Sequence, residues 1–489
     1  MAQGLSAPAW TRGWRLALLL LVVTLLARAQ TFGNPVIEFD EQFYRLVGER
    51  MLHGALPYVD IWDRKPIGLF LLYALAALVG GEHALSYQLL AALFVAATAG
   101  LVHAMARRLG AGWFGPLVAA LLSILWLDLL QGEGGQASVF TGLPMCGAAL
   151  VLLRQVTGEA DRHRLGRDGA AAMLLVGLAA QIKYTVLAEG FYFGLLLLWL
   201  GWRGGRSPAR LAGLAMLWAG LAALPTCLAW AGYAAIGQGN TWLFANVTSI
   251  FLRAPMPPGD MLGEAAGLFA MLLLLLAAAA LGWRRRRAAD PGARFVVGWA
   301  IAAILAIVAM RSFSPHYGIP LVPPLCVLAA PALERMRRAA IGLTVVAALA
   351  GQALVGFFIW SKGDADTVRH MAAAIGPAPR CIFVFDGFPA LYSETHACLP
   401  GRFLFPSLLN GLMERDAIGI DPVREVTRIM ARAPDAVILD APRWSLRNPE
   451  TTAVVDRWLA AHYDLVLKEE TGKGRFRMVY RRRPGRTGD

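Results

Sequence analysis

The stretch LGEAAGLFAMLLLLLAAAALGWRRRR (262–287) contains the two features that decide the fold of this chain. Its first part, 262–283, is almost entirely apolar and is long enough to cross the hydrocarbon core of a bilayer as a helix. Four consecutive arginines follow, and a basic end of this kind typically marks the cytoplasmic side of a membrane helix. The stretch therefore predicts a transmembrane helix with a defined direction.

The composition of the whole chain agrees with this prediction. Of its 489 residues, 57% are hydrophobic and only 16% are charged, whereas soluble domains carry about 25% charged residues. This composition excludes an ordinary soluble enzyme and a disordered chain. The net charge of +13 could indicate nucleic acid or an anionic membrane surface as partner, and the positions of the charges decide between them.

Eleven segments within residues 1–360 have this apolar character and predict a polytopic helical bundle. The predicted spans are 14–29, 84–106, 113–130, 137–154, 169–182, 185–202, 211–236, 262–283, 295–311, 318–333 and 339–360. A further apolar stretch, IGLFLLYALAALVG (67–80), has only 14 residues. That length favours a helix at the outer membrane surface over a span.

The basic residues support this choice. With 67–80 kept at the surface, 19 of the 27 Lys and Arg in residues 1–360 fall on one side of the membrane. Because basic loops stay in the cytoplasm, the N-terminus is predicted inside and the C-terminal tail outside. Most of the positive charge is then a topology signal, which predicts a lipid bilayer and not nucleic acid as the partner.

The tail, 361–489, is predicted to form a separate small periplasmic α/β domain after a transmembrane domain of residues 1–360. Its patterns are typical of three strands and two amphipathic helices: CIFVF (381–385), DAVILD (435–440) and RFRMVYRRR (475–483) for the strands, and EVTRIMAR (425–432) and TTAVVDRWLAAHY (451–463) for the helices. The predicted fold class is therefore mainly α, a polytopic transmembrane helical bundle with a small C-terminal α/β domain.

The first apolar segment allows two interpretations. Residues 12–30 combine basic flanks, an apolar run and Ala27-Arg28-Ala29, a pattern typical of signal-peptide cleavage. Because many further spans follow, we favour an uncleaved first helix over a cleaved signal peptide.

Two of the five cysteines, Cys381 and Cys398, fall in the predicted outside domain. An oxidising exterior permits a disulfide between them, which would close a short loop. The sequence leaves a reduced pair as an equal alternative.

Acidic residues crowd the first outer loop, 30–83, and indicate where chemistry could take place. Asp40 and Glu41 open a helical pattern, DEQFYRLVGERMLHG (40–54). Acids in a first turn suit the helix dipole, and they are also placed to provide a general base at the membrane surface. Three other acids of this loop are predicted to be solvated charges: Glu38, Glu49 and Asp60.

A second cluster, YVDIWDRKPIG (58–68), combines acidic and basic side chains ahead of the short apolar stretch. Pro66 suits the first turn of a helix, which places Asp63, Arg64 and Lys65 at a helix N-terminus, where anions bind well. Lys183 lies between two short spans, where an ionisable side chain indicates a function by default, although its amine could instead reach the interface. Carboxylates beside basic groups at a membrane surface suit a substrate that carries a phosphate.

These patterns resemble the polytopic C-type (GT-C) glycosyltransferases, especially the dolichyl-phosphate-mannose–protein mannosyltransferase and lipid A aminoarabinose transferase families. Members carry an Asp-Glu pair that opens a surface helix and, further on, an acidic residue near Lys-Pro before an apolar helix. Asp40-Glu41 and Asp63-x-Lys65-Pro66 match this order. Two later segments are also similar to the family's short fifth span and late outer loop: QIKYTVL (181–187) and RSFSPHYGIPLVPPL (311–325).

The resemblance implies a hexosyl- or pentosyltransferase of the bacterial cytoplasmic membrane that moves a sugar from a polyprenyl phosphate to a lipid, glycan or protein, with inversion. It implies Asp40, with Glu41, as the base, and Asp63 as a residue that orients the acceptor or binds a divalent metal. Basic residues would hold the donor phosphate and offset the charge of the leaving group: Arg64, Lys65, Lys183, Arg253, Arg311 and His316.

The chain departs from the family at one position. Many members have a further acid at the end of the third outer-facing span, and the residue aligned with it here is Ser138. This substitution puts a metal site of two carboxylates in doubt, and Glu133 is the neighbouring candidate for a ligand beside Asp40 and Asp63.

Other functions stay open on the sequence. A transporter would place ionisable residues near mid-membrane and often has related halves, whereas the ionisable residues here gather at one surface. A ligase or polymerase of cell-surface glycans would use similar donors but usually has a large outer loop later in the chain. A membrane-anchored assembly protein would need neither Lys183 nor the cluster around Asp63.

Overall fold

The computed structural model describes residues 8, 13–110, 112–159, 162–284, 290–443 and 446–484. Contacts divide the chain into two compact units. Unit 1 comprises residues 1–30, 88–229 and 257–355, and unit 2 comprises 31–87, 230–256 and 356–489. The predicted domain of residues 1–360 is therefore divided by packing, because the first outer loop belongs with the C-terminal residues.

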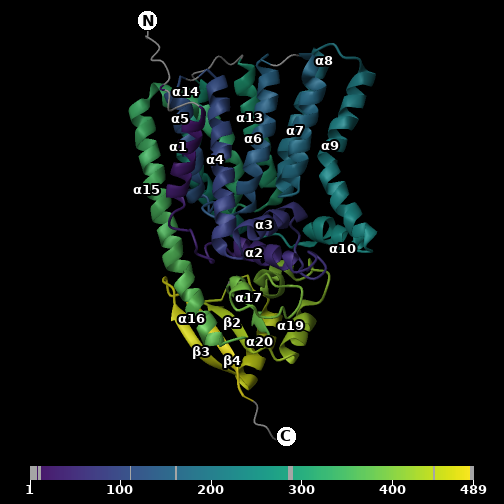
Figure 1. The fold of residues 1–489 in the computed structure, drawn as a ribbon, viewed down its shortest axis with the longest axis vertical. Helices are drawn as coiled ribbons and strands as arrows, with labels where there is room; N and C mark the ends of the chain where they lie inside the picture. The colour runs from purple at the N-terminus through teal and green to yellow at the C-terminus, as the bar shows by residue number, and fades with distance from the viewer. Residues whose placement is uncertain are drawn as a thin grey trace. The chain divides into compact units, whose positions relative to one another are not determined.

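Unit 1 is built from helices, and each of the eleven predicted spans is helical. Their bounds are α1 Gly13–Ala27, α4 Ala84–Arg108, α5 Phe114–Leu129, α6 Ala137–Val156, α7 Leu165–Ala180, α8 Leu187–Arg203, α9 Pro208–Ala235, α12 Pro258–Arg284, α13 Pro291–Met310, α14 Val322–Arg335 and α15 Arg337–Lys362. Short turns occur at η2 Arg162–Arg164, η3 Tyr184–Val186 and η5 Pro315–Leu321. Figure 1 shows α4, α6, α7 and α8 side by side.

The lengths and surfaces of these helices fit a bilayer. Among the described residues, eight helical segments are long and apolar enough to cross a membrane, whereas α1 and α5 are shorter apolar helices. Large apolar side chains are exposed on the outside of the unit, such as Met216 and Leu228 of α9. A bilayer accounts for this surface, since soluble monomers rarely expose large apolar patches. The chain is a multi-pass membrane protein.

The helices of unit 1 differ in how deeply they are enclosed. In the segment Pro315–Arg335, which contains α14, 78% of the apolar span is buried, against 6% for α9. A Cβ added at Gly282 of α12 would overlap the carbonyl oxygen of Leu328 in α14. Such contact between backbones is how helices associate in lipid, where the hydrophobic effect does not drive them together.

Unit 2 joins short helices to a four-stranded sheet. Its elements are α2 Phe39–Leu52, α3 Ile67–Gly80, α10 Gly239–Leu243, η4 Phe244–Thr248, α11 Ser249–Leu252, α16 Ala365–Ile375, β1 Ile382–Val384, α17 Ala390–Glu394, α18 Pro406–Asn410, η6 Leu412–Glu414, α19 Pro422–Ala431, β2 Ala436–Ala441, α20 Pro449–His462, β3 Tyr463–Glu470 and β4 Phe476–Arg482. The predicted helices at 40–54 and 67–80 correspond to α2 and α3. The C-terminal strands and helices lie where the sequence predicts them, with β3 in addition.

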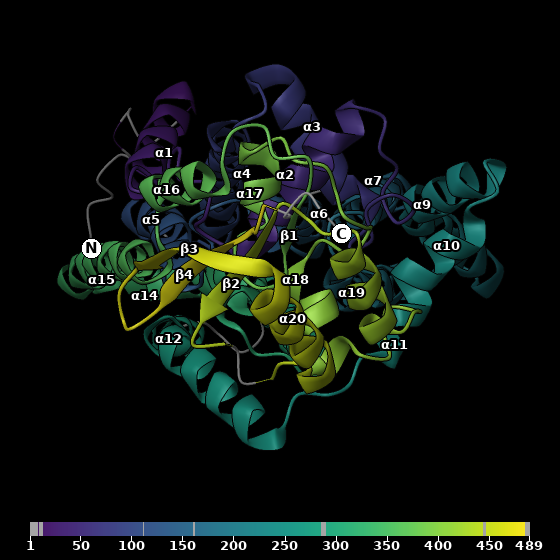
Figure 2. The ribbon, with the colours of Figure 1, turned by 90° about the horizontal axis from the view of Figure 1, so that it is seen from below.

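The sheet has the order β1-β2-β4-β3. Strands β1 and β2 are parallel, with Ile382 opposite Ala436, and the other two pairings are antiparallel. Figure 2 shows α16 on one side of the sheet and α19 and α20 on the other. The buried strands β1 and β2 therefore form the core of the α/β domain, and the fold class is the predicted one: a transmembrane helical bundle with a small C-terminal α/β domain.

Local sequence fixes where the two helices over the sheet begin. The Asp421 side chain accepts hydrogen bonds from the backbone N–H groups of Val423 and Arg424, and Pro422 occupies the first turn. Asn448 and Pro449 play the same parts in α20. Such caps satisfy N–H groups that have no partner within the helix, so both helices begin two to three residues earlier than the apolar pattern predicts.

A disulfide joins Cys381 and Cys398, whose Cα atoms are 4.6 Å apart. The bond ties the residue before β1 to the loop that follows α17. Among the described residues, the three remaining cysteines are free.

Candidate functional site

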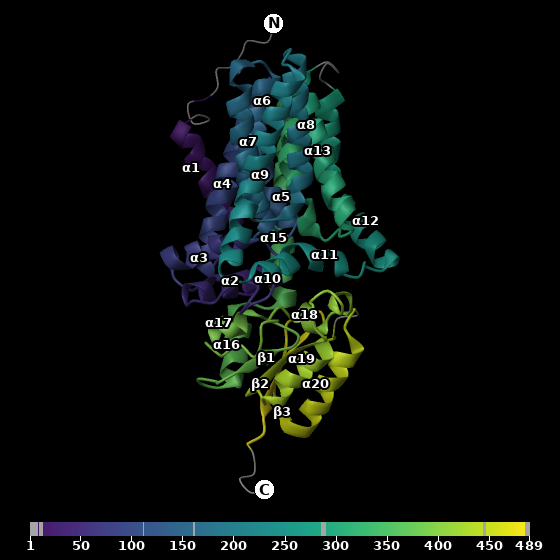
Figure 3. The ribbon, with the colours of Figure 1, turned by 90° about the vertical axis from the view of Figure 1, so that its right-hand side faces the viewer.

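Helix α2 and the segment that leads into α3 carry acidic residues of the first outer loop, and the two helices pack closely together (Figures 1 and 3). A Cβ added at Gly48 of α2 would lie 2.7 Å from the backbone nitrogen of Ala74 and 2.8 Å from Tyr73 in α3. Only glycine permits this approach, because a real Cβ cannot come so near to backbone atoms. This close crossing fixes the position of the start of α2 relative to the segment that leads into α3.

The Asp-Glu pair at the start of α2 is divided by the helix geometry. Asp40 is half-buried, whereas Glu41 is 0% exposed. Successive residues of a helix point about 100° apart, and the Glu41 charge raises the pKa of Tyr73 in α3, after the larger effect of burial. Glu41 therefore faces the packing between α2 and α3, and Asp40 is the member of the pair that a substrate can reach.

Asp63 lies near Asp40 and Lys65. Burial raises the pKa of Asp63, the Lys65 charge and the backbone N–H of Arg64 oppose this shift, and the Asp40 charge adds to it. The Asp63 Oδ1 atom accepts a hydrogen bond of 2.6 Å from the Arg64 backbone nitrogen. The Lys65 ammonium lies 5.6 Å from the ring centroid of Tyr44. The structure thus brings three of the predicted site residues together within unit 2.

Arg64 and Arg253, both predicted to bind phosphate, meet at a residue that the sequence analysis missed. Arg64 donates to both carboxylate oxygens of Glu414, at 3.0 and 2.7 Å. The Nε atom of Arg253 lies 2.8 Å from the same carboxylate. Glu414 is one of several acids in the tail and lies 161 residues after Arg253 in the sequence. Its neighbouring residues form no pattern that predicts a contact with Arg64 or Arg253.

Two acids that the sequence analysis predicts to be solvated are buried, so that prediction is wrong for them. Glu38 pairs with Lys362 at the end of α15, and burial raises the pKa of Glu38. Glu49 accepts hydrogen bonds of 2.5 Å from Arg45 and from Ser393 of α17. Buried charges require partners, and here Lys362 and Ser393 come from distant parts of the sequence, whereas Arg45 lies one helical turn before Glu49. The third acid, Asp60, is exposed as predicted.

Unit 1 holds the remaining predicted residues, and Lys183 is the most buried of the predicted basic residues among them. Its ammonium donates a 2.8 Å hydrogen bond to the Ser138 hydroxyl and lies 4.2 Å from the ring centroid of Tyr317. Lys183 therefore contacts the neutral oxygen of Ser138, the residue that the resemblance aligns with an acid of the GT-C families. The His316 ring is tilted by 34° against that of Tyr317, with 4.7 Å between the ring centroids, which brings it next to this group.

Glu133 lies in a loop that is held by Arg28, a residue noted in the sequence only as part of the cleavage-like pattern. Arg28 is 1% exposed. Its Nη1 donates to the carbonyl oxygens of Glu133 and Gly134, at 2.9 and 2.7 Å, and its Nη2 donates to that of Gly132. Glu133 is also buried. Arg28 thus fixes the backbone of the loop that leads into α6 and Ser138.

The other predicted residues do not form a group with these. Arg311 caps α13 in a left-handed conformation, with φ of 50°, and its side chain is exposed. Within the described ranges, no three or more His, Cys, Asp or Glu side chains are placed to hold a metal ion. Asp40 and Asp63 belong to unit 2, whereas Glu133 belongs to unit 1.

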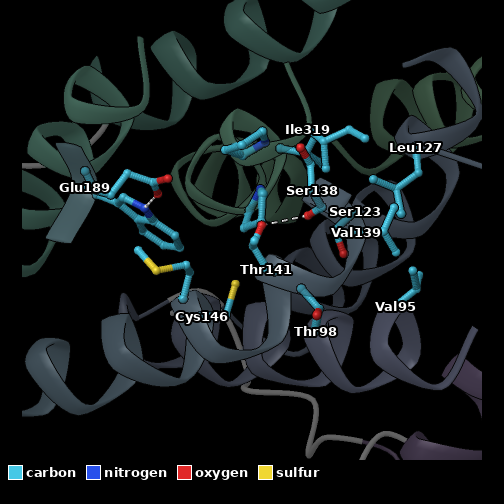
Figure 4. A pocket seen from close by; sticks show the side chains of 16 residues that line it. Val95, Thr98, Ser123, Leu127, Ser138, Val139, Thr141, Cys146, Glu189 and Ile319 are labelled. Carbon is cyan, nitrogen blue, oxygen red and sulfur yellow. Dashed lines mark hydrogen bonds between the residues drawn. The ribbon is translucent and has the colours of Figure 1, made fainter. Parts of the chain in front are cut away.

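A narrow cavity of about 30 Å³ lies inside unit 1, between α4, α5, α6, α8, α13 and the start of α14. Figure 4 shows Ser138 and Thr141 on one wall and Glu189, hydrogen-bonded to the indole of Trp299, on another. Most of the lining is apolar. A volume of this size holds about two water molecules, so the cavity does not provide room for a sugar.

Comparisons with known proteins agree with the fold. No family model matches the chain, and no curated protein matches it. Among solved structures, ArnT from Cupriavidus metallidurans bound to undecaprenyl phosphate is similar, with a TM-score of 0.64 at 15% identity over 97% of this chain and 98% of that one. The apo structure of the same protein gives a TM-score of 0.67 at 15% identity, over 95% and 96%. The chain thus has the fold of ArnT, a lipid A aminoarabinose transferase, along nearly its whole length.

Proposed function

We propose that this chain is a membrane glycosyltransferase that moves a sugar from a polyprenyl phosphate to an acceptor, with Asp40 as the base. One observation carries the proposal: Asp40, a half-buried carboxylate at the start of α2, is near enough to Asp63 to add to the rise that burial causes in the pKa of Asp63, and Lys65 is near enough to oppose it. The fold supports a lipid phosphate as the leaving group, since one of the similar structures is bound to undecaprenyl phosphate.

The proposed reaction uses this group as follows. The acceptor hydroxyl or amine gives its proton to the Asp40 carboxylate while its oxygen or nitrogen attacks the anomeric carbon of the sugar. The bond between that carbon and the phosphate oxygen breaks, and its electron pair stays on the phosphate. Lys65 and the two guanidiniums at Glu414 offset the negative charge that grows there. Asp63 orients the acceptor.

The proposal assigns none of these steps to a metal ion. Two carboxylates, Asp40 and Asp63, suit a hard cation such as Mg²⁺, but the residues that the structure describes offer no third acidic, His or Cys ligand beside them. The roles predicted for Lys183, His316 and Arg311 stay predictions.

The proposal includes an orientation in the bacterial cytoplasmic membrane. The distribution of Lys and Arg places the N-terminus in the cytoplasm and unit 2 in the periplasm. A phosphatase reporter that is active only in the periplasm, fused after Asp489, should be active in intact cells. Activity of a matching cytoplasmic reporter at the same position would contradict the orientation and the position of the site.

The base is tested with a pair of matched variants. Asp40→Asn should abolish release of polyprenyl phosphate from a panel of radiolabelled polyprenyl-phosphate sugars, since the amide cannot accept the acceptor's proton. Asp60→Asn removes a charge from the same loop at an exposed residue whose carboxylate accepts a hydrogen bond from the Leu56 backbone, and it should keep its activity. Equal activity of the two variants, at equal expression, would remove Asp40 from its role.

A further inference from the structure

The Glu414 carboxylate lies between two guanidiniums. Arg64 uses both Nη atoms on both carboxylate oxygens, and Arg253 adds its Nε atom to one of them. The Glu414 side chain is 5% exposed, whereas those of Arg64 and Arg253 are 17% and 38% exposed. The carboxylate therefore lies on the inner side of the cluster and the guanidiniums lie toward its surface.

The three residues come from three segments that are fixed to each other. Next to the cluster, the backbone nitrogen of Ala254 donates to the Met413 carbonyl at 3.1 Å, and that of Trp62 donates to the Arg402 carbonyl at 2.8 Å. The Arg64 guanidinium also lies 5.3 Å from the ring centroid of Trp62. Because these contacts hold the backbone, the side chains meet in a defined geometry.

The cluster keeps donors that its own carboxylate does not use. Arg253 approaches Glu414 most closely through its Nε atom, and within the described part of the chain its two Nη atoms make no hydrogen bond. Two guanidiniums and one carboxylate leave a net charge of +1. A free guanidinium fork matches the spacing of phosphate oxygens, so the cluster has the charge and the donors that a phosphate requires.

We propose that Glu414 is a positioning residue that holds Arg64 and Arg253 together as a binding site for the lipid phosphate. The inference rests on the proposed function. Two guanidiniums repel each other when no anion lies between them, and the buried carboxylate removes that repulsion before the substrate arrives. Glu414 does not block the site, because its side chain is more deeply buried than those of the two arginines.

Binding of undecaprenyl phosphate to the purified full-length protein in detergent tests this role. Glu414→Gln should weaken binding about 10- to 100-fold, since it removes a charged partner of both arginines. Glu414→Asp should restore part of the affinity. Glu425→Gln removes the carboxylate of another acid–arginine pair of unit 2, with Arg428, and should bind like the wild type.

Kinetics and a double variant separate positioning from a general loss of structure. With a sugar donor that the wild type uses, Glu414→Gln should raise KM by the same factor and change kcat little, because the lost interaction holds the donor in its ground state as well as in the transition state. Adding Arg253→Ala to Glu414→Gln should cost less than the two single effects combined, since both changes disable one site.

The possible results have distinct meanings. Wild-type binding with equal affinity in a well-folded Glu414→Gln protein would overturn the inference and leave the proposed function standing. A wild type that neither binds undecaprenyl phosphate nor releases it from any donor would overturn the proposed function. If Glu414→Gln unfolds, Arg253→Ala keeps the Arg64–Glu414 pair, and unchanged binding in that variant would also overturn the inference.

Discussion

Replacing Arg28 by methionine should destabilise unit 1, because no other side chain can fill its place. Methionine has a similar length but offers no donors, so the carbonyl oxygens of Gly132, Glu133 and Gly134 lose their side-chain partner. The same substitution tests whether the first helix is retained. Cleavage after Ala29 would remove Arg28 and, with it, the residue that holds this loop.

The magnitude follows from the number and kind of hydrogen bonds. A bond from a charged donor contributes about 1.5–3 kcal/mol, so three bonds set an upper limit of about 9 kcal/mol. In a membrane the unfolded chain finds other partners and the net contribution of polar contacts falls to a fraction of this. We expect a loss of about 3 kcal/mol for Arg28→Met. Arg28→Lys should lose roughly half as much, because its ammonium keeps the charge but lacks the planar fork.

Thermal unfolding of the purified protein in detergent measures this effect. A loss of 3 kcal/mol should lower Tm by about 3–5 °C, because the unfolding entropy grows with the number of residues. Arg154→Met is the matched control, since Arg154 ends α6 with an exposed side chain, and its Tm should stay close to that of the wild type. Mass spectrometry of the intact chain should find the residues before Ala29. Equal Tm values for the two variants, or a mature chain that begins after Ala29, would refute the reasoning.

Three further predictions concern unit 2. Gly48→Ala should cost about 1–3 kcal/mol of stability, because the added Cβ forces α2 away from α3. The control Gly100→Ala adds a Cβ in open space and should cost no stability. Denaturation of the two variants compares them, and equal stability would contradict the close crossing. Replacing both Cys381 and Cys398 by serine should lower the stability of the protein by about 2–4 kcal/mol, because the disulfide is lost. Thiol labelling of the wild-type protein should find no reactive thiol at these two residues. A free thiol at either residue would refute the disulfide. Burial and the neighbouring Asp440 carboxylate raise the pKa of Asp386 to about 7. Protonated Asp386 therefore contributes at most about 4 kcal/mol of stability. This contribution should be complete below pH 4 and should be lost by about pH 7. Asp386→Asn should remove this slope from the pH dependence of unfolding, and an unchanged slope would assign it to other groups.

The membrane spans follow from the sequence because their signal is local. A run such as 262–283 is apolar around its whole circumference, and no tertiary contact is needed to place it in a bilayer. The same holds for α3, whose short apolar run and preceding Pro66 mark both its length and its start. The buried strands β1 and β2 are similarly evident, since continuous runs of branched apolar residues favour a sheet core.

Strand β3 shows where this reasoning stops. It lies at the edge of the sheet, directly after α20, and most of its residues are exposed. Its apolar run is only three residues long, Leu465 to Leu467, and is mostly exposed, so it gives no clear signal of a buried strand. Its place is decided by pairing with β4, which lies beyond a turn and is buried on its other side by β2.

The candidate site divides in the same way. The sequence by itself determined that acids and bases gather around Asp40 and Asp63, because these residues lie close together along the chain. Only the tertiary structure decided that Asp40 is accessible and Glu41 is enclosed, since this depends on which side of α2 meets α3. The partners of the charged residues, such as Glu414 for Arg64, come from segments hundreds of residues apart. A charge is stabilised by whatever folding brings beside it, and local sequence does not contain that information.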